Sequence, residues 1–64
     1  MPGTFMTVGE VSEYLRVHPS TIYRLLRRKQ IPAFRIGSDW RFKTTSIDQW
    51  QADLERAQSE NRRA

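Results

Sequence analysis

The most constraining feature of this sequence is a pair of short helical patterns separated by only a few residues. Val8, Val11 and Leu15 recur with the spacing of one helix face. After a turn over residues 16–18, Pro19 suits the first position of a second helix, where its missing amide hydrogen costs nothing. Two short helices joined by so tight a turn form a helix-turn-helix.

The ends of both helices can be predicted from local signals. Thr7 and Glu10 have the spacing of a capping box, so the first helix is expected to begin at Thr7 and to end near Arg16. The second helix is expected to cover residues 19–30. Its end is predicted from the Ile-Pro pair that follows, because a residue before proline disfavours the helical conformation.

Residues 33–43 change to alternating spacing, which predicts a two-stranded wing. We expect a three-residue loop over 37–39, because a two-residue loop would mix apolar and charged side chains on one face. The pairs expected across the two strands are Ile36 with Trp40, Phe34 with Phe42, and Arg35 with Arg41. A two-stranded ribbon is marginal alone, so Trp40 and Phe42 are expected to pack on the helices. Base stacking by these two rings is the alternative.

A third helix is predicted after the wing. Thr45 or Ser46 is expected to cap it, and its apolar stripe is Ile47, Trp50 and Leu54. The predicted fold is therefore mainly α with a small two-stranded β wing. The element order is helix, turn, helix, two strands, helix, which is a winged helix-turn-helix.

Length and composition limit what such a domain can do. The 64 residues hold no cysteine, which excludes disulfides and thiolate zinc sites, and the single histidine, His18, has no partner for catalysis. We therefore expect no enzyme activity, metal, cofactor or small-molecule ligand. No apolar run is long enough for a membrane span. Residues 1–5 are expected to form a flexible leader, residues 6–57 the domain, and residues 58–64 a polar tail that frays.

The basic charge is concentrated in the middle of the chain. Residues 16–43 carry eight Lys or Arg and one Asp, whereas residues 1–15 and 44–64 are each net acidic. Segregated positive charge is the electrostatic pattern expected of a protein that binds nucleic acid. A basic face that only contacts solvent is the alternative.

The second predicted helix presents a basic ridge opposite its apolar side. At about 100° per residue, Ser20, Arg24 and Arg27 share one face. The candidate DNA-binding residues of this helix are Ser20, Thr21, Tyr23, Arg24, Arg27 and Arg28. Arginine can bind guanine O6 and N7 with two hydrogen bonds, or it can bind a phosphate.

Each candidate also has a simpler interpretation. The three arginines can be an ordinary solvated face, Tyr23 a packing residue, and the serine and threonine only capping groups. His18 is interpreted as a turn or capping residue rather than a base reader, and Lys29 as a charge at the helix end.

The wing supplies the remaining candidates, which are Arg35, Arg41 and Lys43. The expected register places Arg35 opposite Arg41. Two like charges repel each other, and a phosphate bound between them would turn this repulsion into attraction. The alternative is that salt screens the repulsion between the two exposed arginines.

Five segments in order carry a resemblance to a known family. They are TVGEVSEYL at 7–15, VHPSTIYRL at 17–25, IPAFRIG at 31–37, WRF at 40–42 and IDQW at 47–50. Together they resemble the excisionase-family DNA-binding domain, a winged helix-turn-helix of the mercury-resistance-regulator (MerR) superfamily. The resemblance covers nearly all of the chain.

This resemblance implies that the second helix enters the major groove of DNA and that the wing grips the adjacent backbone or minor groove. It places the candidates at positions 20, 21, 23, 24 and 27 in the groove and those at 35, 41 and 43 on the wing. Many relatives carry a basic residue just after the wing glycine, where this chain has Ser38 followed by Asp39. The wing tip is therefore expected to hold phosphate less firmly.

The function expected from these features is sequence-specific binding of double-stranded DNA. The protein would act as an excision factor that bends DNA for a recombinase, or as a small transcription regulator, in the cytoplasm on the nucleoid. One reading helix gives a small interface, so neighbouring copies on tandem sites are expected. The alternative is an adaptor whose basic face binds an acidic protein.

Overall fold

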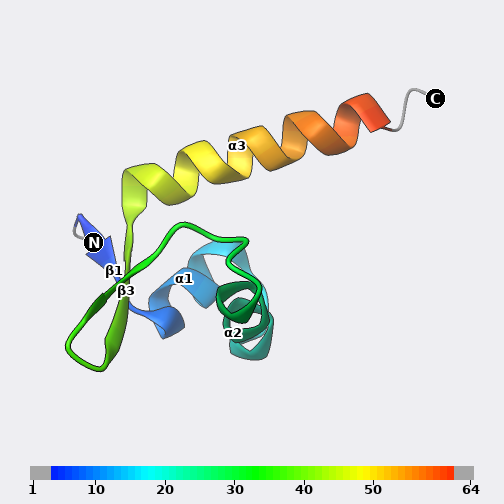
Figure 1. Ribbon diagram of the computed structural model, residues 1–64. Coiled ribbons are helices and arrows are strands. Elements are labelled where there is room, and N and C mark those ends of the chain that lie inside the picture. Colours follow the sequence, from blue (N-terminus) through cyan, green and yellow to red (C-terminus); the bar gives the residue numbers. More distant parts are fainter. Residues whose placement is uncertain (1–3, 62–64) are drawn as a thin grey trace.

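The computed structural model describes residues 4–61, which form three helices and a small antiparallel sheet (Figure 1). The elements in chain order are β1 (Phe5–Met6), α1 (Val8–Leu15), α2 (Pro19–Arg27), β2 (Phe34–Ile36), β3 (Asp39–Lys43) and α3 (Thr44–Asn61). The strand order is β1-β3-β2, and α1 packs against α2. This arrangement confirms the predicted fold class, mainly α with a β wing.

The two ends of α1 lie where they are predicted, and each is closed by local hydrogen bonds. The Glu10 amide donates to Thr7 Oγ1 at 3.1 Å, and the Thr7 amide donates to Glu10 Oε1 at 2.9 Å, which completes the capping box. At the other end Arg16 adopts a left-handed φ of 59°, and the Val17 amide donates to the Ser12 carbonyl. This closure turns the chain sharply toward α2.

α2 begins at Pro19 as predicted but ends at Arg27, so the predicted end at Gln30 is wrong. Lys29 adopts a left-handed φ of 55°, and the Gln30 amide donates to the Leu25 carbonyl at 2.9 Å. These two features form a Schellman motif, which reverses the chain and ends a helix. The helix is therefore closed before the chain reaches the Ile-Pro pair.

The predicted flexible leader is partly wrong, because Phe5 lies in the sheet. β1 pairs antiparallel with β3, with Phe5 opposite Lys43 and Met6 opposite Phe42. Met6 is only 2% exposed and belongs to the core. The first three residues of the predicted leader lie outside the described part of the chain. A strand this short takes its conformation from the partner strand, so it leaves no periodic pattern in the sequence.

The predicted register of the wing is wrong. β2 and β3 are joined by the two-residue loop Gly37-Ser38, and the pairs are Phe34 with Arg41, Arg35 with Trp40, and Ile36 with Asp39. Gly37 has a φ of 64°, which suits a two-residue hairpin loop that begins with glycine. Hydrophobic alternation fixes a register only where one face is buried, and all of β2 is exposed.

α3 follows β3 without a loop and begins at Thr44, so neither Thr45 nor Ser46 is its cap as predicted. The helix continues to Asn61, which makes part of the predicted frayed tail helical. The last three residues of that tail are outside the described residues. In Figure 1, α3 starts at the sheet and runs past the rest of the domain.

The hydrophobic core lies between the sheet, the first two helices and the start of α3. Its buried members are Met6, Val11, Ile22, Leu26, Ile31, Phe42 and Ile47. Trp40 and Trp50 are half-buried and pack against this cluster, so the predicted packing of Trp40, Phe42 and Trp50 is confirmed. Leu54, the last residue of the predicted α3 stripe, is 42% exposed.

Candidate nucleic-acid interface

α2 turns one face into the core and leaves the opposite face to solvent. Ile22 is fully buried and Leu26 nearly so, which fixes the rotation of the helix about its axis. The candidates Ser20, Tyr23, Arg24, Arg27 and Arg28 are exposed, and Thr21 is half-buried. Within the described part of the chain, no carboxylate forms an ion pair with the α2 arginines. The predicted basic ridge is therefore free to meet a ligand.

The N-terminus of α2 is capped by His18, as its interpretation as a capping residue predicts. The Ser20 amide donates to His18 Nδ1 at 3.1 Å, and the same nitrogen lies 2.9 Å from Ser20 Oγ. The Thr21 amide donates to the His18 carbonyl. Neither Ser20 nor Thr21 is the N-cap. The imidazole instead holds the serine hydroxyl at the positive end of the helix, where anions bind most favourably.

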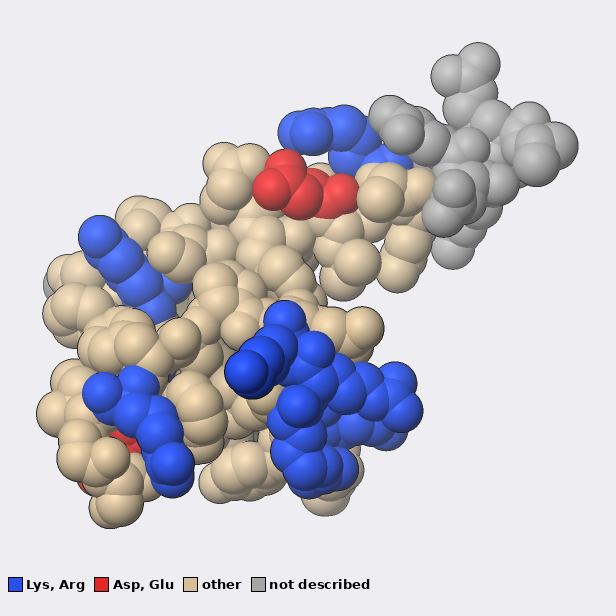
Figure 2. Space-filling model, viewed as in Figure 1, with Lys and Arg blue, Asp and Glu red and all other residues tan. Residues whose placement is uncertain are grey.

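Lysine and arginine side chains gather over α2. Figure 2 shows one continuous basic cluster there, separate basic side chains on the wing side, and acidic side chains on α3. Residues 24–29 contribute four of the basic groups, which are Arg24, Arg27, Arg28 and Lys29. Such a surface attracts a polyanion and accelerates its association.

The two wing arginines are each supported by the wing itself. The Arg35 guanidinium lies over the Trp40 ring, 5.0 Å from its centroid, and Arg35 Nη2 donates to the Ser38 carbonyl at 3.5 Å. Arg41 Nη1 donates to the Trp40 carbonyl at 2.8 Å. Arg35 does not face Arg41, so the unfavourable pair expected between them does not exist. The stack on Trp40 instead orients the Arg35 side chain.

α2 and the wing meet at an open hollow. Its lining includes Thr7 before α1, Tyr23 from α2, and Arg35, Trp40 and Arg41 from the wing. The structure therefore brings three predicted contact residues, from two separate elements, to one depression. The phenol and the two guanidinium groups can each bind a phosphate, and the Asp39 carboxylate lies on the same lining. No pattern in the sequence links Tyr23 with the wing, because the residues are distant in the chain.

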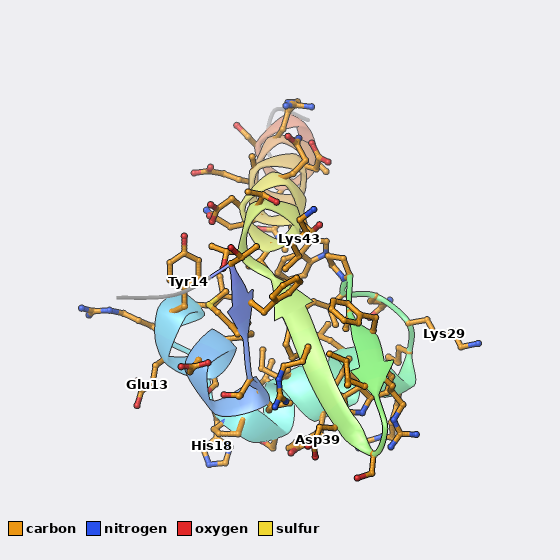
Figure 3. The ribbon with its side chains drawn as sticks, turned by 90° about the vertical axis from the view of Figure 1, so that its left-hand side faces the viewer. Glu13, Tyr14, His18, Lys29, Asp39 and Lys43 are labelled. Atoms are coloured by element: carbon orange, nitrogen blue, oxygen red, sulfur yellow. The ribbon has the colours of Figure 1, made fainter. Side chains whose placement is uncertain are left out.

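Lys43 lies apart from this hollow. It pairs with Phe5 and borders a second hollow that is also lined by Pro32, Ala33, Phe34 and Ser46. Figure 3 shows Lys43 and Asp39 at opposite ends of β3. Lys43 is thus not brought together with Tyr23 and the wing arginines, although the sequence groups all of them as candidates.

Comparison with known proteins agrees with this architecture. The sequence profile of a family described as "Helix-turn-helix domain" matches residues 5–55. The chain belongs to this helix-turn-helix family. The match includes both short helices and the whole wing, and it ends within α3, which the structure continues to Asn61.

The helix-turn-helix chain also resembles two curated proteins of Mycobacterium tuberculosis. They are "Putative DNA-binding protein MT0521" of strain CDC 1551 / Oshkosh and "Putative DNA-binding protein Rv0500A" of strain H37Rv. Each is 36% identical over 42 residues, which is 66% of this chain and 54% of the relative. The chain thus matches about half the length of these relatives. No solved structure matches it.

Two further properties of this helix-turn-helix domain concern other kinds of site. Among residues 4–61, no helix combines the length and the apolar character that a membrane crossing requires. The same residues contain no group of three His, Cys, Asp or Glu side chains placed to hold a metal ion.

Proposed function

We propose that this helix-turn-helix protein binds double-stranded DNA in a sequence-specific manner. α2 lies in the major groove, and the wing contacts the adjacent backbone or minor groove. The observation that carries the proposal is the shared hollow, where Tyr23 of α2 lies beside Arg35 and Arg41 of the wing. Through Tyr23 this hollow connects the exposed face of α2 with the wing, which supports a joint contact with DNA. The names of the two mycobacterial relatives support the same ligand.

Within this proposal the residues divide by the part of DNA that they contact. Arg24 and Arg27, at the centre of the ridge, bind base edges, because a guanidinium matches guanine O6 and N7. The proposed contacts to the sugar–phosphate backbone are Ser20, Thr21, Tyr23 and Arg28 from α2, and Arg35, Arg41 and Lys43 from the wing. Backbone contacts supply affinity and orientation, whereas base contacts supply specificity.

The cellular role that we propose is that of an excisionase or MerR-like factor on the nucleoid. It assists a recombinase in excision, or it regulates transcription as a small repressor or activator. Because a single reading helix buries little surface, adjacent copies on tandem sites would supply the affinity that one copy lacks. Selecting bound sequences from a random duplex library separates the two roles. Sites at recombination junctions support excision, and sites over promoters support regulation.

The test of DNA binding is a fluorescence anisotropy titration of a random-sequence duplex across a salt series. The wild type is compared with the double variant Arg24→Ala/Arg27→Ala. The matched control is Arg56→Ala, which removes an arginine that pairs with Asp53 on α3, 3.5 Å away. We expect wild-type affinity to fall steeply with salt, because binding releases counterions from phosphates.

The double variant should bind more weakly and show a shallower salt dependence, whereas the control should match the wild type. If the double variant binds the duplex as tightly as the wild type, α2 is not part of the interface. No binding at low salt would reject DNA as the ligand.

A further inference from the structure

The outer face of the sheet carries aromatic rings beside basic side chains. Phe5 and Phe34 are 50% and 40% exposed, although phenylalanine is among the residues most often fully buried. Strand pairing places Phe5 opposite Lys43 and Phe34 opposite Arg41, and directly opposed residues share one face of a sheet. We call Phe5, Phe34, Arg41 and Lys43 the aromatic platform. It faces away from the core, because Phe42, which alternates with the two basic residues along β3, is fully buried.

The rings of the aromatic platform hold each other in place. Phe5 and Phe34 meet edge to face, with their centroids 5.7 Å apart and their planes at 80°. This is a favourable arrangement of two aromatic rings, and it joins β1 to β2 across β3. The contact still leaves much of both rings in solvent. Exposed aromatic rings held on a sheet are the kind of surface on which nucleic-acid bases stack.

A hollow continues the aromatic platform toward the start of α3. It is lined by Pro32, Ala33, Phe34, Lys43 and Ser46. The lining is apolar apart from Lys43 and Ser46, which offer an ammonium group and a hydroxyl group. The ligand that suits this lining is a flat ring joined to an anion, because the ring packs on Phe34 while the ammonium and the hydroxyl bind the anion. A nucleotide has both parts.

The charges on the aromatic platform favour a polyanion. Both charged members, Arg41 and Lys43, are basic, and among residues 4–61 no carboxylate forms an ion pair with either of them. Asp39 lies at the opposite end of β3 from Lys43, where it pairs with the exposed Ile36 (Figure 3). A protein that covered only the rings would leave both cations without a partner. A nucleic-acid strand supplies bases for the rings and phosphates for the cations.

We propose that the aromatic platform binds unpaired DNA, with bases stacked on Phe5 and Phe34 and the neighbouring phosphates bound by Arg41 and Lys43. Bases within a duplex stack on one another and offer only their edges in the grooves, so an exposed ring reaches the face of a base only in an unpaired strand. Arg41 also borders the hollow between Tyr23 and the wing, so the platform adjoins the proposed duplex site. This position favours DNA as the source of the strand. The inference goes beyond the proposed function, because α2 takes no part in the platform.

The first test is a fluorescence anisotropy titration of a labelled thymidine octamer, which stays unpaired. Phe34→Leu removes a ring but keeps an apolar side chain, and its matched control is Ile36→Ala. Lys43→Gln removes a charge, and its matched control is Arg56→Gln on α3. We expect both controls to bind like the wild type and each platform variant to lose roughly tenfold in affinity, which is within the contribution of one stacked base. Equal losses for Ile36→Ala and Phe34→Leu would mean a general apolar contact and would overturn the inference.

A second comparison separates the aromatic platform from α2. The double variant Arg24→Ala/Arg27→Ala should lose less than about threefold in affinity for the octamer at about 0.15 M salt, because α2 packs on the core side of the sheet and salt screens charges that are not in contact. Phe34→Leu should bind a duplex of about 12 base pairs as tightly as the wild type.

The outcomes of this comparison distinguish the two proposals. A wild type that binds the duplex but not the octamer would overturn the inference and leave the proposed function intact. A wild type that binds the octamer but not the duplex would do the reverse. Octamer binding that is lost with the α2 arginines but kept by Phe34→Leu would assign the unpaired strand to α2 and overturn the inference.

Photocrosslinking locates the bases directly. An octamer in which iodouracil replaces thymine is irradiated with the protein, and mass spectrometry identifies the residues that carry the adduct. The expected adducts are on Phe5 and Phe34. Adducts confined to Tyr23 or Trp40 would place the strand between α2 and the wing and contradict the inference. Tighter binding of a uridine octamer of RNA than of the thymidine octamer would overturn the assignment to DNA, because the 2′-hydroxyl groups would then contribute to recognition.

Discussion

Trp50 Nε1 donates a hydrogen bond to the Gln30 carbonyl at 2.9 Å, and this bond links α3 to the segment that follows α2. The two residues come from separate parts of the chain, and Gln30 lies directly after the reversal at Lys29. The indole thus supports the point where the chain leaves the proposed recognition helix. The position of α2 relative to the wing depends in part on a residue that lies outside both.

Removing this hydrogen bond should lower stability measurably. Trp50→Phe keeps much of the packing but leaves the Gln30 carbonyl without its indole donor, so we expect a loss of about 1 kcal/mol in the free energy of unfolding. Trp50→Ala also removes the ring from the core margin and should cost about 3 kcal/mol. Urea denaturation measures both values. Wild-type stability for Trp50→Phe would contradict a structural role for the hydrogen bond.

The capping box of α1 can be tested with a matched pair of threonines. Thr7→Ala removes the side chain that accepts from the Glu10 amide and should cost about 1 kcal/mol. Thr45 is exposed within the first turn of α3, and Thr45→Ala should change stability by less than about 0.5 kcal/mol. Thermal denaturation of both variants checks this difference. Equal losses would mean that Thr7 does not act as a cap.

Two glycines should respond to alanine in opposite directions. Gly37 has a φ of 64° in the wing loop, so Gly37→Ala should destabilise the protein by about 1 kcal/mol. Gly9 lies in α1, where an added methyl group would sit 3.9 Å from Thr7 Oγ1 without a clash. Gly9→Ala should therefore stabilise the protein by about 0.5–1 kcal/mol. Urea denaturation of the two variants should give changes of opposite sign. A Gly37→Ala protein that is as stable as the wild type would contradict the left-handed conformation of Gly37 in the two-residue loop.

Tyr14 should titrate above the ordinary range of a tyrosine. Its hydroxyl donates to Asp48 Oδ1 at 2.5 Å, and this hydrogen bond raises the pKa of Tyr14 above 10.0, with smaller contributions from desolvation and from the carboxylate charge. As the pH rises, the unfolded chain therefore loses the Tyr14 phenolic proton at a lower pH than the folded protein does. The resulting stabilisation is present below pH 10.0 and is lost as the pH rises through the pKa of folded Tyr14.

In a Tyr23→Phe background Tyr14 is the remaining tyrosine, so phenolate absorbance reports its pKa directly. Adding Asp48→Asn should lower that pKa toward 10.0. An unchanged titration after Asp48→Asn would show that the hydrogen bond does not control this group.

The features predicted correctly are those that depend on neighbours in the chain. Thr7 and Glu10 form a capping box because they are three residues apart, and Pro19 starts α2 because of its own geometry. The rotation of α2 follows from the burial of Ile22, which the helical period already indicates. The exposed ridge of candidate contact residues therefore follows from the sequence pattern alone.

Two features predicted wrongly, the flexible leader and the wing register, depend on the rest of the fold. β1 exists because β3 offers it a free edge, and Phe5 carries no sign of that pairing. The wing register was inferred from one buried face, but Phe34 and Ile36 are exposed, so Arg35 pairs with Trp40 instead of Arg41. The hollow that joins α2 to the wing is likewise a product of tertiary packing.

The most direct test of the central claim is a two-dimensional amide NMR titration of the labelled protein with a duplex of about 12 base pairs at low salt. The account predicts that amide signals of residues 20–28 and 35–41 shift together, whereas those of residues 52–57 on α3 stay in place. Shifts confined to α3, or to the wing without α2, would contradict the proposal that α2 and the wing form one DNA-binding surface.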